Sequence, residues 1–272
     1  MIEFDHVAKT YGDHTAVGDF SATVAAHTTT VLVGSSGCGK TTLLRMVNRM
    51  VDASAGQVRI DGEDVAHRNK VELRRSIGYV MQNGGLLPHK RVEDNIATVP
   101  LLQGTARSDA IRRAHELMEL VGLDRDLARR YPHQLSGGQQ QRVGVARALA
   151  PDPNILLMDE PFGAVDPLVR QDLQLELLRL QGELGKTVLF VTHDIDEALL
   201  LGEQIIILAV GGKVVQRGSG EEILAAPADP FVERFLGLDR GRRQFHTRPG
   251  TDGVPVLVDN HGRAVGVLRE DS

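Results

Sequence analysis

Short apolar runs alternate with longer segments of helical periodicity along most of the chain. The runs at 30–33, 155–158 and 187–192 have the length and the aliphatic content of buried strands. The segment that begins at Pro167 instead repeats leucine every three or four positions, which is the spacing of one helix face. This alternation predicts an α/β fold built on a mainly parallel sheet.

Two regions depart from this alternation. Residues 2–26 have the pattern of short strands with a turn at Tyr11-Gly12-Asp13. A block from about 86 to 152 is helical, with apolar residues recurring at helical spacing before Gly122, a typical C-terminal cap. We therefore expect strands at the start of the chain and a helical subdomain inserted into the sheet.

The composition changes near Leu238. Residues 240–243 are basic and glycine-containing, as in a linker, and two strand-like runs follow at 255–259 and 264–268. We therefore expect a main domain at 1–238 and a short tail at 239–272.

Composition and charge exclude some classes of protein. Of 272 residues, 42% are apolar and 25% are charged, with a net charge of −5, so the basic surface typical of a DNA-binding protein is not expected. The single cysteine, Cys38, allows no internal disulfide and favours a reducing compartment. The acidic start is unlike a signal peptide, and no apolar run approaches the ~20 residues of a membrane span. A membrane role would therefore need a partner that spans the bilayer.

Residues 34–41 carry the most specific chemistry. They read Gly-Ser-Ser-Gly-Cys-Gly-Lys-Thr, which fits the phosphate-binding P-loop, with an apolar run before it and a helix-like segment, Lys40 to Met50, after it. The glycines let backbone N–H groups surround an anion beside the positive end of the helix. Lys40 supplies a charge for the β- and γ-phosphates, and the Thr41 hydroxyl can bind Mg²⁺. The glycine order disfavours a dinucleotide site.

Two carboxylates follow the apolar run at 155–158. In a parallel sheet they emerge at the C-terminal end of a strand, where ligands of α/β proteins bind. Asp159 can hold Mg²⁺, directly or through water, and Glu160 can polarise a water molecule for attack on the γ-phosphorus. With a P-loop upstream, this pair predicts nucleotide hydrolysis.

A third motif, Leu-Ser-Gly-Gly-Gln, occupies residues 135–139. Ser136 is a good N-cap, and two glycines expose backbone N–H groups beside the positive end of the helix that follows. This arrangement predicts a second anion-binding site, although a plain loop-to-helix junction has the same pattern.

The three motifs in this order resemble the ATP-binding subunit of an ABC transporter. The resemblance covers roughly residues 1–238 and implies a P-loop NTPase fold with a RecA-like parallel core, an antiparallel β part and an inserted α-helical subdomain. It implies ATP and Mg²⁺ as cofactors and an ATPase coupled to transmembrane transport. It also implies a head-to-tail homodimer at the cytoplasmic face of the membrane, bound to transmembrane permease subunits and served indirectly by an extracytoplasmic solute-binding protein, with no nucleic acid partner.

Single positions extend the resemblance. Tyr11 resembles the aromatic residue that stacks on adenine, Gln82 the Q-loop glutamine and His193 the switch histidine at the γ-phosphate. Residues 163–166 resemble the D-loop that signals across the dimer, with Val165 where leucine is frequent. The resemblance implies catalytic roles for Glu160, His193 and Gln82, and metal contacts from Thr41, Gln82 and Asp159. The implied nucleotide contacts are Tyr11, Gly34, Ser35, Ser36, Gly37, Cys38, Gly39, Lys40, Thr41, Thr42, Ser136, Gly137, Gly138, Gln139 and Asp166.

Four passages indicate a subfamily. Residues 71–79, 86–89, 131–134 and 192–198 are similar to ATPases of importers of quaternary-amine osmolytes such as glycine betaine, choline, carnitine and proline betaine. Amino-acid and methionine importers share parts of these passages and stay an alternative. The segment 83–95 is expected to face the coupling helices of the permease.

Residues 254–268 resemble the closing strand-turn-strand of a CBS module, but too few residues follow the linker for a whole module, so we expect a CBS-like remnant or a dimer-stabilising tail. Non-transport ABC ATPases that act on DNA or ribosomes usually carry coiled-coil insertions, tandem halves or basic arms, and none is seen in the sequence. A P-loop kinase or GTPase leaves the motif at 135–139 unexplained.

Overall fold

The computed structural model forms two compact units, Met1–Gly220 and Glu221–Ser272. It describes residues 1–82, 84–163, 165–239, 243, 245–249, 254–259 and 262–267. Asn83, Ala164, Leu268, most of the predicted linker at 240–243 and residues 260–261 between the two predicted strands of the tail lie outside the described residues. The predicted division at residue 238 stays a prediction.

A six-stranded sheet forms the centre of the first unit. Its order is β10-β9-β3-β8-β7-β6, and all neighbouring pairs are parallel except β9 with β10. This confirms the predicted, mainly parallel sheet, and it places the carboxyl ends of β3, β8, β7 and β6 along one edge. The strands are β3 (Thr29–Gly34), β6 (Ile77–Val80), β7 (Ile155–Asp159), β8 (Thr187–Thr192), β9 (Gln204–Ala209) and β10 (Lys213–Gly218).

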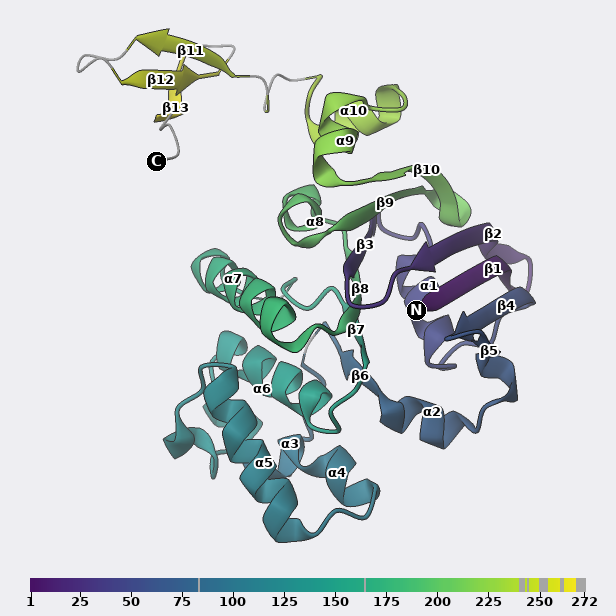
Figure 1. Cartoon of the computed structure of the whole chain (residues 1–272), viewed down its shortest axis with the longest axis vertical. Helices are drawn as coiled ribbons and strands as arrows, with labels where there is room; N and C mark the ends of the chain where they lie inside the picture. Colours follow the sequence, from purple (N-terminus) through teal and green to yellow (C-terminus); the bar gives the residue numbers. More distant parts are fainter. Residues whose placement is uncertain are drawn as a thin grey trace. The chain divides into compact units, whose positions relative to one another are not determined.

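An antiparallel sheet of order β2-β1-β4-β5 accompanies the parallel one (Figure 1). Helix α1 (Lys40–Val47) contacts strands of both sheets, and its apolar side chains share one core with them. The predicted antiparallel β part is therefore present, and its packing fixes the helix that follows the P-loop. The strands are β1 (Ile2–Tyr11), β2 (His14–Val24), β4 (Ala55–Ile60) and β5 (Glu63–Asp64).

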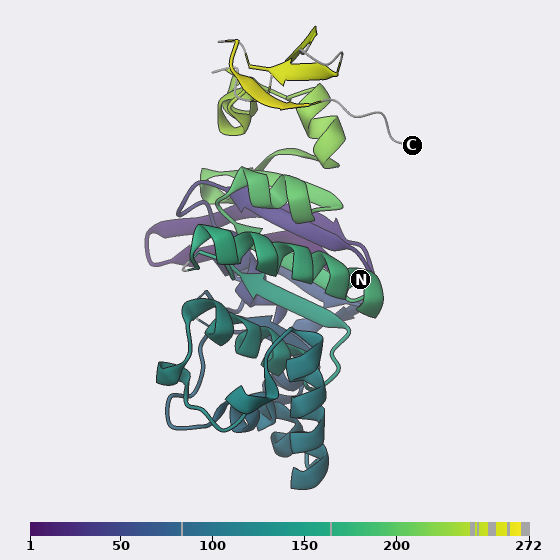
Figure 2. The ribbon, with the colours of Figure 1, turned by 90° about the vertical axis from the view of Figure 1, so that its left-hand side faces the viewer.

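The remaining helices of the first unit include two groups. One forms the predicted subdomain between residues 86 and 152, and Figure 2 shows the other, α7 and α8, across the face of the parallel sheet turned to the viewer. The subdomain contains α3 (Val92–Ile96), α4 (Thr98–Leu102), α5 (Arg107–Leu120), η2 (Arg125–Leu127), η3 (Pro132–Gln134) and α6 (Gly137–Leu149). Elsewhere lie η1 (Val65–His67), α2 (Lys70–Ser76), α7 (Pro167–Leu184), α8 (Ile195–Leu201) and η4 (Val210–Gly212).

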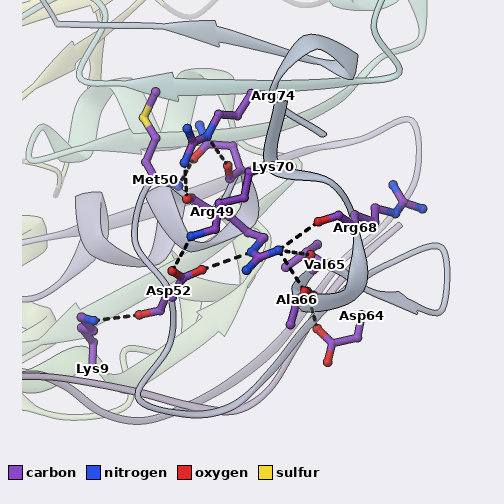
Figure 3. A network of polar contacts seen from close by, with 11 residues as sticks. Lys9, Arg49, Met50, Asp52, Asp64, Val65, Ala66, Arg68, Lys70 and Arg74 are labelled. Atoms are coloured by element: carbon purple, nitrogen blue, oxygen red, sulfur yellow. Dashed lines mark hydrogen bonds and ion pairs between the residues drawn. The ribbon is translucent and has the colours of Figure 1, made fainter. Parts of the chain in front are cut away.

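The helix after the P-loop ends earlier than the sequence predicts. It was expected to reach Met50, but α1 stops at Val47, and Arg49 has a left-handed backbone with φ of 54°. The Arg74 guanidinium donates to the carbonyl oxygens of Asn48 at 3.2 Å and Arg49 at 2.6 Å, which satisfies acceptors at the helix end. This tertiary contact, drawn in Figure 3, is not visible in the apolar periodicity.

Arg49 is the centre of the network in Figure 3. Its guanidinium donates to the carbonyl oxygens of Val65 (3.3 Å), Ala66 (2.9 Å) and Arg68 (2.9 Å), and it pairs with Asp52 at 3.1 Å. These bonds tie the end of α1 to the turn η1, just before α2. The helix that starts at the P-loop is thereby fixed at its far end to the segment that leads into β6.

The second unit contains two helices and a three-stranded antiparallel sheet of order β11-β12-β13. Two of its strands match the predicted hairpin in the tail, whereas β11 was not predicted. Its CBS-like character stays a prediction. The elements are α9 (Gly220–Ala225, which begins at the last residue of the first unit), α10 (Pro230–Leu236), β11 (His246–Pro249), β12 (Pro255–Val258) and β13 (Ala264–Val267).

Candidate functional site

The carboxyl ends of four neighbouring strands gather the predicted site residues. The P-loop follows β3, His193 follows β8, Asp159 and Glu160 lie at the end of β7, and Gln82 follows β6. Because β3, β8, β7 and β6 are parallel neighbours, these segments leave the sheet at the same edge. One chain thus brings the first and second motifs, the glutamine and the histidine into one site.

Glycine is required in the P-loop by its backbone. Gly37 and Gly39 have φ of 78° and 103°, and a Cβ on Gly39 would lie 2.7 Å from the Ala16 carbonyl oxygen. Because Gly39 lies this close to Ala16 on β2, the β1–β2 hairpin, which carries Tyr11, lies beside the loop. Ser35, Ser36 and Gly37 are exposed, so this part of the loop is open to a ligand.

Lys40 is held inside the loop. Its ammonium donates to the carbonyl oxygens of Gly34 at 2.8 Å and Ser35 at 2.9 Å, and the residue is 5% exposed. These acceptors are neutral, and a phosphate anion is a stronger acceptor for the same donors. Cys38 is fully buried, with its Sγ 3.7 Å from the ammonium, and packs as a small core residue.

Asp159 is fixed by three donors. The Thr41 hydroxyl donates to Oδ1 at 2.8 Å, while the Tyr79 hydroxyl (3.0 Å) and the Arg45 guanidinium (3.3 Å) donate to Oδ2. Burial raises the pKa of Tyr79 to about 12, so its hydroxyl keeps the proton that it donates. The hydrogen bond with Tyr79 in turn raises the pKa of Arg45.

Arg45 and Tyr79 were not predicted from the sequence. Arg45 lies one helical turn after Thr41 on α1, a spacing that places both on one face. Tyr79 pairs in register with Leu157, two residues before Asp159, and only the order of the strands reveals this neighbour.

The donor set at Thr41 and Asp159 suits Mg²⁺. A hydroxyl and a carboxylate lie 2.8 Å apart, and hard oxygen ligands of this kind are the ones that Mg²⁺ prefers. Within the described ranges, no group of three or more His, Cys, Asp and Glu side chains could hold a metal ion. A Mg²⁺ ion here would therefore take further ligands from phosphate oxygens and water, as in nucleotide sites.

Glu160 contacts Gln82 and His193, the other two residues predicted to be catalytic. Its Oε2 is 3.0 Å from His193 Nδ1 and accepts a 3.5 Å hydrogen bond from the Gln82 amide. Its backbone is left-handed, with φ of 46°. The Glu160 N–H holds this conformation by donating a 2.9 Å hydrogen bond to the Val191 carbonyl oxygen. A non-glycine residue in this conformation costs about 1–2 kcal/mol, a strain that often marks functional sites. The three side chains meet, while their individual roles stay predictions.

The motif at 135–139 lies elsewhere in the chain. The Ser136 hydroxyl accepts from the Gln139 N–H at 3.2 Å, and the Gln139 side chain accepts from the Ser136 N–H at 2.9 Å, so the predicted N-cap of α6 is present. Ser136 and Gly137 are exposed. Helix α6 packs on β6, α3, α5 and α7, and no hydrogen bond between described residues joins its start to the P-loop (Figure 1).

Two further predicted contacts are exposed. Tyr11 is 48% exposed at the end of β1, and the Lys9 ammonium lies 4.9 Å from the centre of its ring. Asp166 lies just before α7. Both positions are accessible to a nucleotide or a second subunit. None of the helices in the described part of the chain has the length and apolar character to span a bilayer.

Comparisons with known proteins identify a family. A family model described as ABC transporter matches residues 17–163. The chain is 52% identical over 255 residues to the glycine betaine uptake system ATP-binding protein YehX of Escherichia coli (strain K12), covering 93% of this chain and 82% of YehX. It is 48% identical over 241 residues to the choline transport ATP-binding protein OpuBA of Bacillus subtilis (strain 168), covering 88% of this chain but only 63% of OpuBA.

A solved structure shares the fold. The dimeric ATP-binding cassette MJ0796, in a post-hydrolysis state bound to ADP and Pi, superposes with a TM-score of 0.73 and 33% identity over 80% of this chain and 98% of that one. The predictions of a P-loop NTPase fold, an ABC-type ATPase and a resemblance to osmoprotectant importers are confirmed. The chain therefore belongs to the ABC transporter family, as one of its ATP-binding subunits.

Proposed function

We propose that this chain hydrolyses ATP to energise the import of quaternary-amine osmolytes, such as glycine betaine, choline, carnitine or proline betaine. The observation that carries the proposal is 52% identity to a glycine betaine uptake subunit, combined with an assembled site around Glu160. The amino-acid and methionine importers remain the alternative for the substrate.

The proposed reaction uses the strand-end site. The P-loop N–H groups at residues 34–42 and the Lys40 ammonium bind the phosphates, and Tyr11 stacks on adenine. Thr41, Asp159 and Gln82 would hold Mg²⁺, which when bound would neutralise charge on the phosphate oxygens.

Residues around the γ-phosphate carry out the hydrolysis step. Glu160 orients the attacking water and accepts its proton, and His193 steadies charge at the γ-phosphate. Both side chains are already in contact at 3.0 Å, which supports their shared role.

A second copy of the chain completes each site in this proposal. The start of α6, where Ser136 and Gly137 are exposed, closes over ATP held by the P-loop of the partner, and Asp166 contacts the partner. The placement of this motif on the helical subdomain, away from its own P-loop, supports an arrangement across two chains.

The dimer would act at the cytoplasmic face of the membrane. Segment 83–95 would receive the coupling helices of the permease subunits, and a solute-binding protein would deliver the osmolyte from outside. ATP binding closes the dimer and hydrolysis reopens it, so the permease alternates between two states. The tail would stabilise the dimer.

Uptake of radiolabelled glycine betaine tests the substrate. The assay uses the native cell at high osmolarity, with other betaine importers deleted, and compares wild type with Glu160→Gln. We expect uptake in wild type and its loss in the variant, with methionine uptake unchanged as the control. Equal betaine uptake in both strains would contradict osmolyte import by this subunit, and a selective loss of methionine uptake would support the alternative.

A further inference from the structure

A buried polar cluster lies directly behind His193. It consists of Thr192 on β8, Glu197 on α8 and Gln174 on α7, which are 1%, 5% and 6% exposed. Buried polar side chains are uncommon, and a buried carboxylate is costly to keep. The reaction described above uses none of these three residues, so their presence needs another reason.

Hydrogen bonds connect the cluster to the backbone on both sides of His193. The Thr192 hydroxyl donates to Glu197 Oε2 at 2.6 Å and accepts from the Asp194 N–H at 3.0 Å. Gln174 donates to the other Glu197 oxygen at 3.1 Å. The threonine hydroxyl thus links a fixed carboxylate to the peptide that follows His193.

The same turn is anchored from the α8 side. The Asp194 carboxylate accepts from the N–H groups of Asp196 (2.8 Å) and Glu197 (3.4 Å), which caps α8. The Arg170 guanidinium lies 3.7 Å from Asp194 and donates to the Val165 carbonyl oxygen at 3.4 Å. The turn that carries His193 is therefore also linked to the D-loop.

Burial raises the pKa of the Glu197 carboxyl, the opposite of what its hydrogen bonds alone would do. An apolar trio of similar volume could fill this space without that penalty. Fully satisfied buried networks instead hold one geometry rigidly, and here the geometry held is that of residues 192–194.

We propose that Thr192 and Glu197, supported by Gln174, are positioning residues that hold His193 so that its ring meets Glu160. This inference rests on the proposed ATP hydrolysis and adds residues that do not touch the nucleotide. The carboxylate fixes the hydroxyl, the hydroxyl fixes the Asp194 peptide, and that peptide sets the direction in which the His193 side chain leaves the backbone.

The test compares two threonines on the same strand. Thr192→Val keeps the side-chain shape and removes the hydroxyl, and we expect kcat for ATP hydrolysis to fall about 10-fold, since small misplacements cost 10–100-fold, with the KM for ATP unchanged. Thr187→Val is the matched control, because Thr187 is also buried (3% exposed) and its hydroxyl accepts from the His27 N–H at 3.0 Å, at the other end of β8. We expect this control to keep the wild-type kcat.

Variants that keep the hydrogen bonds distinguish loss of His193 positioning from loss of folding. Thr192→Ser retains the hydroxyl, and Glu197→Gln retains both hydrogen bonds if the Gln174 amide turns over, so both should keep kcat within about 2-fold of wild type. The His193 ring resonances in the nucleotide-free protein should shift in Thr192→Val and stay in place in Thr187→Val.

Three results would overturn the inference: a wild-type kcat in Thr192→Val, an equal fall in Thr187→Val, or a rise in KM at constant kcat. Wild-type protein and His193→Ala are measured in the same assay. If wild type hydrolyses ATP and His193→Ala does not, but Thr192→Val matches wild type, only the positioning role is wrong. If purified wild type fails to hydrolyse ATP, the proposed function is wrong as well.

Discussion

Glu160→Gln is expected to lower kcat for ATP hydrolysis by about 100-fold or more while ATP still binds, because general-base catalysis contributes 10²–10⁴-fold. Glutamine keeps the size of the side chain and can still bond to His193, but it cannot accept the proton of the attacking water. The P-loop, Lys40 and Thr41 are untouched, so affinity for the phosphates should persist.

Single-turnover hydrolysis measures the expected fall in rate, and equilibrium ATP binding measures whether affinity for ATP persists. The control is Glu116→Gln, which makes the same chemical change on α5, where the carboxylate forms exposed ion pairs with Arg112 and Arg113. Glu116→Gln should match wild type in both assays. Turnover of Glu160→Gln at the wild-type rate would show that another group accepts the proton.

Lys40→Met is expected to weaken ATP binding by about 100-fold, in line with the 2–5 kcal/mol lost when one partner of a buried charge pair is removed. The ammonium is nearly buried and already points into the loop, so its attraction to a phosphate is little screened by water. Methionine keeps the side chain up to the ε position and lacks the ammonium with its charge and donors.

Isothermal titration with ATP and Mg²⁺ measures this loss, and thermal melting shows that the variant is folded. Lys213→Met, an exposed lysine at the start of β10, removes the same charge elsewhere and should bind as wild type. Binding of ATP to Lys40→Met with wild-type affinity would mean that the backbone N–H groups alone hold the phosphates.

Much of the parallel sheet could be predicted because its strands are bare apolar runs. The segments at β3, β7 and β8 have no polar face, which is typical of strands covered on both sides. Once these strands were placed, the rule that ligands bind at carboxyl ends located Asp159 and Glu160, whereas His193 came from the resemblance to ABC ATP-binding subunits. The helical subdomain was likewise visible from its periodicity and from the capping motif at Ser136.

Features that depend on tertiary contacts could not be predicted. The early end of α1 is set by Arg74 from a different helix, and the left-handed backbone of Glu160 is held by a bond to Val191 on the neighbouring strand. The Tyr79 hydroxyl reaches Asp159 only because β6 lies beside β7. None of these contacts leaves a periodic signal in the sequence.

In the proposed dimer, each ATP site is built from two copies of the chain. Mixing two inactive variants tests this arrangement most directly. Glu160→Gln disables the strand-end site, and Gly137→Asp places a negative charge at the exposed start of α6, where it would repel phosphate without disturbing the fold, since the first turn of a helix tolerates acidic residues.

The measurement is ATP hydrolysis by each purified variant and by their equimolar mixture. A head-to-tail mixed dimer contains one site with both defects and one site with none, so we predict that the mixture is active although each variant alone is not. A mixture as inactive as its two components would contradict the shared site.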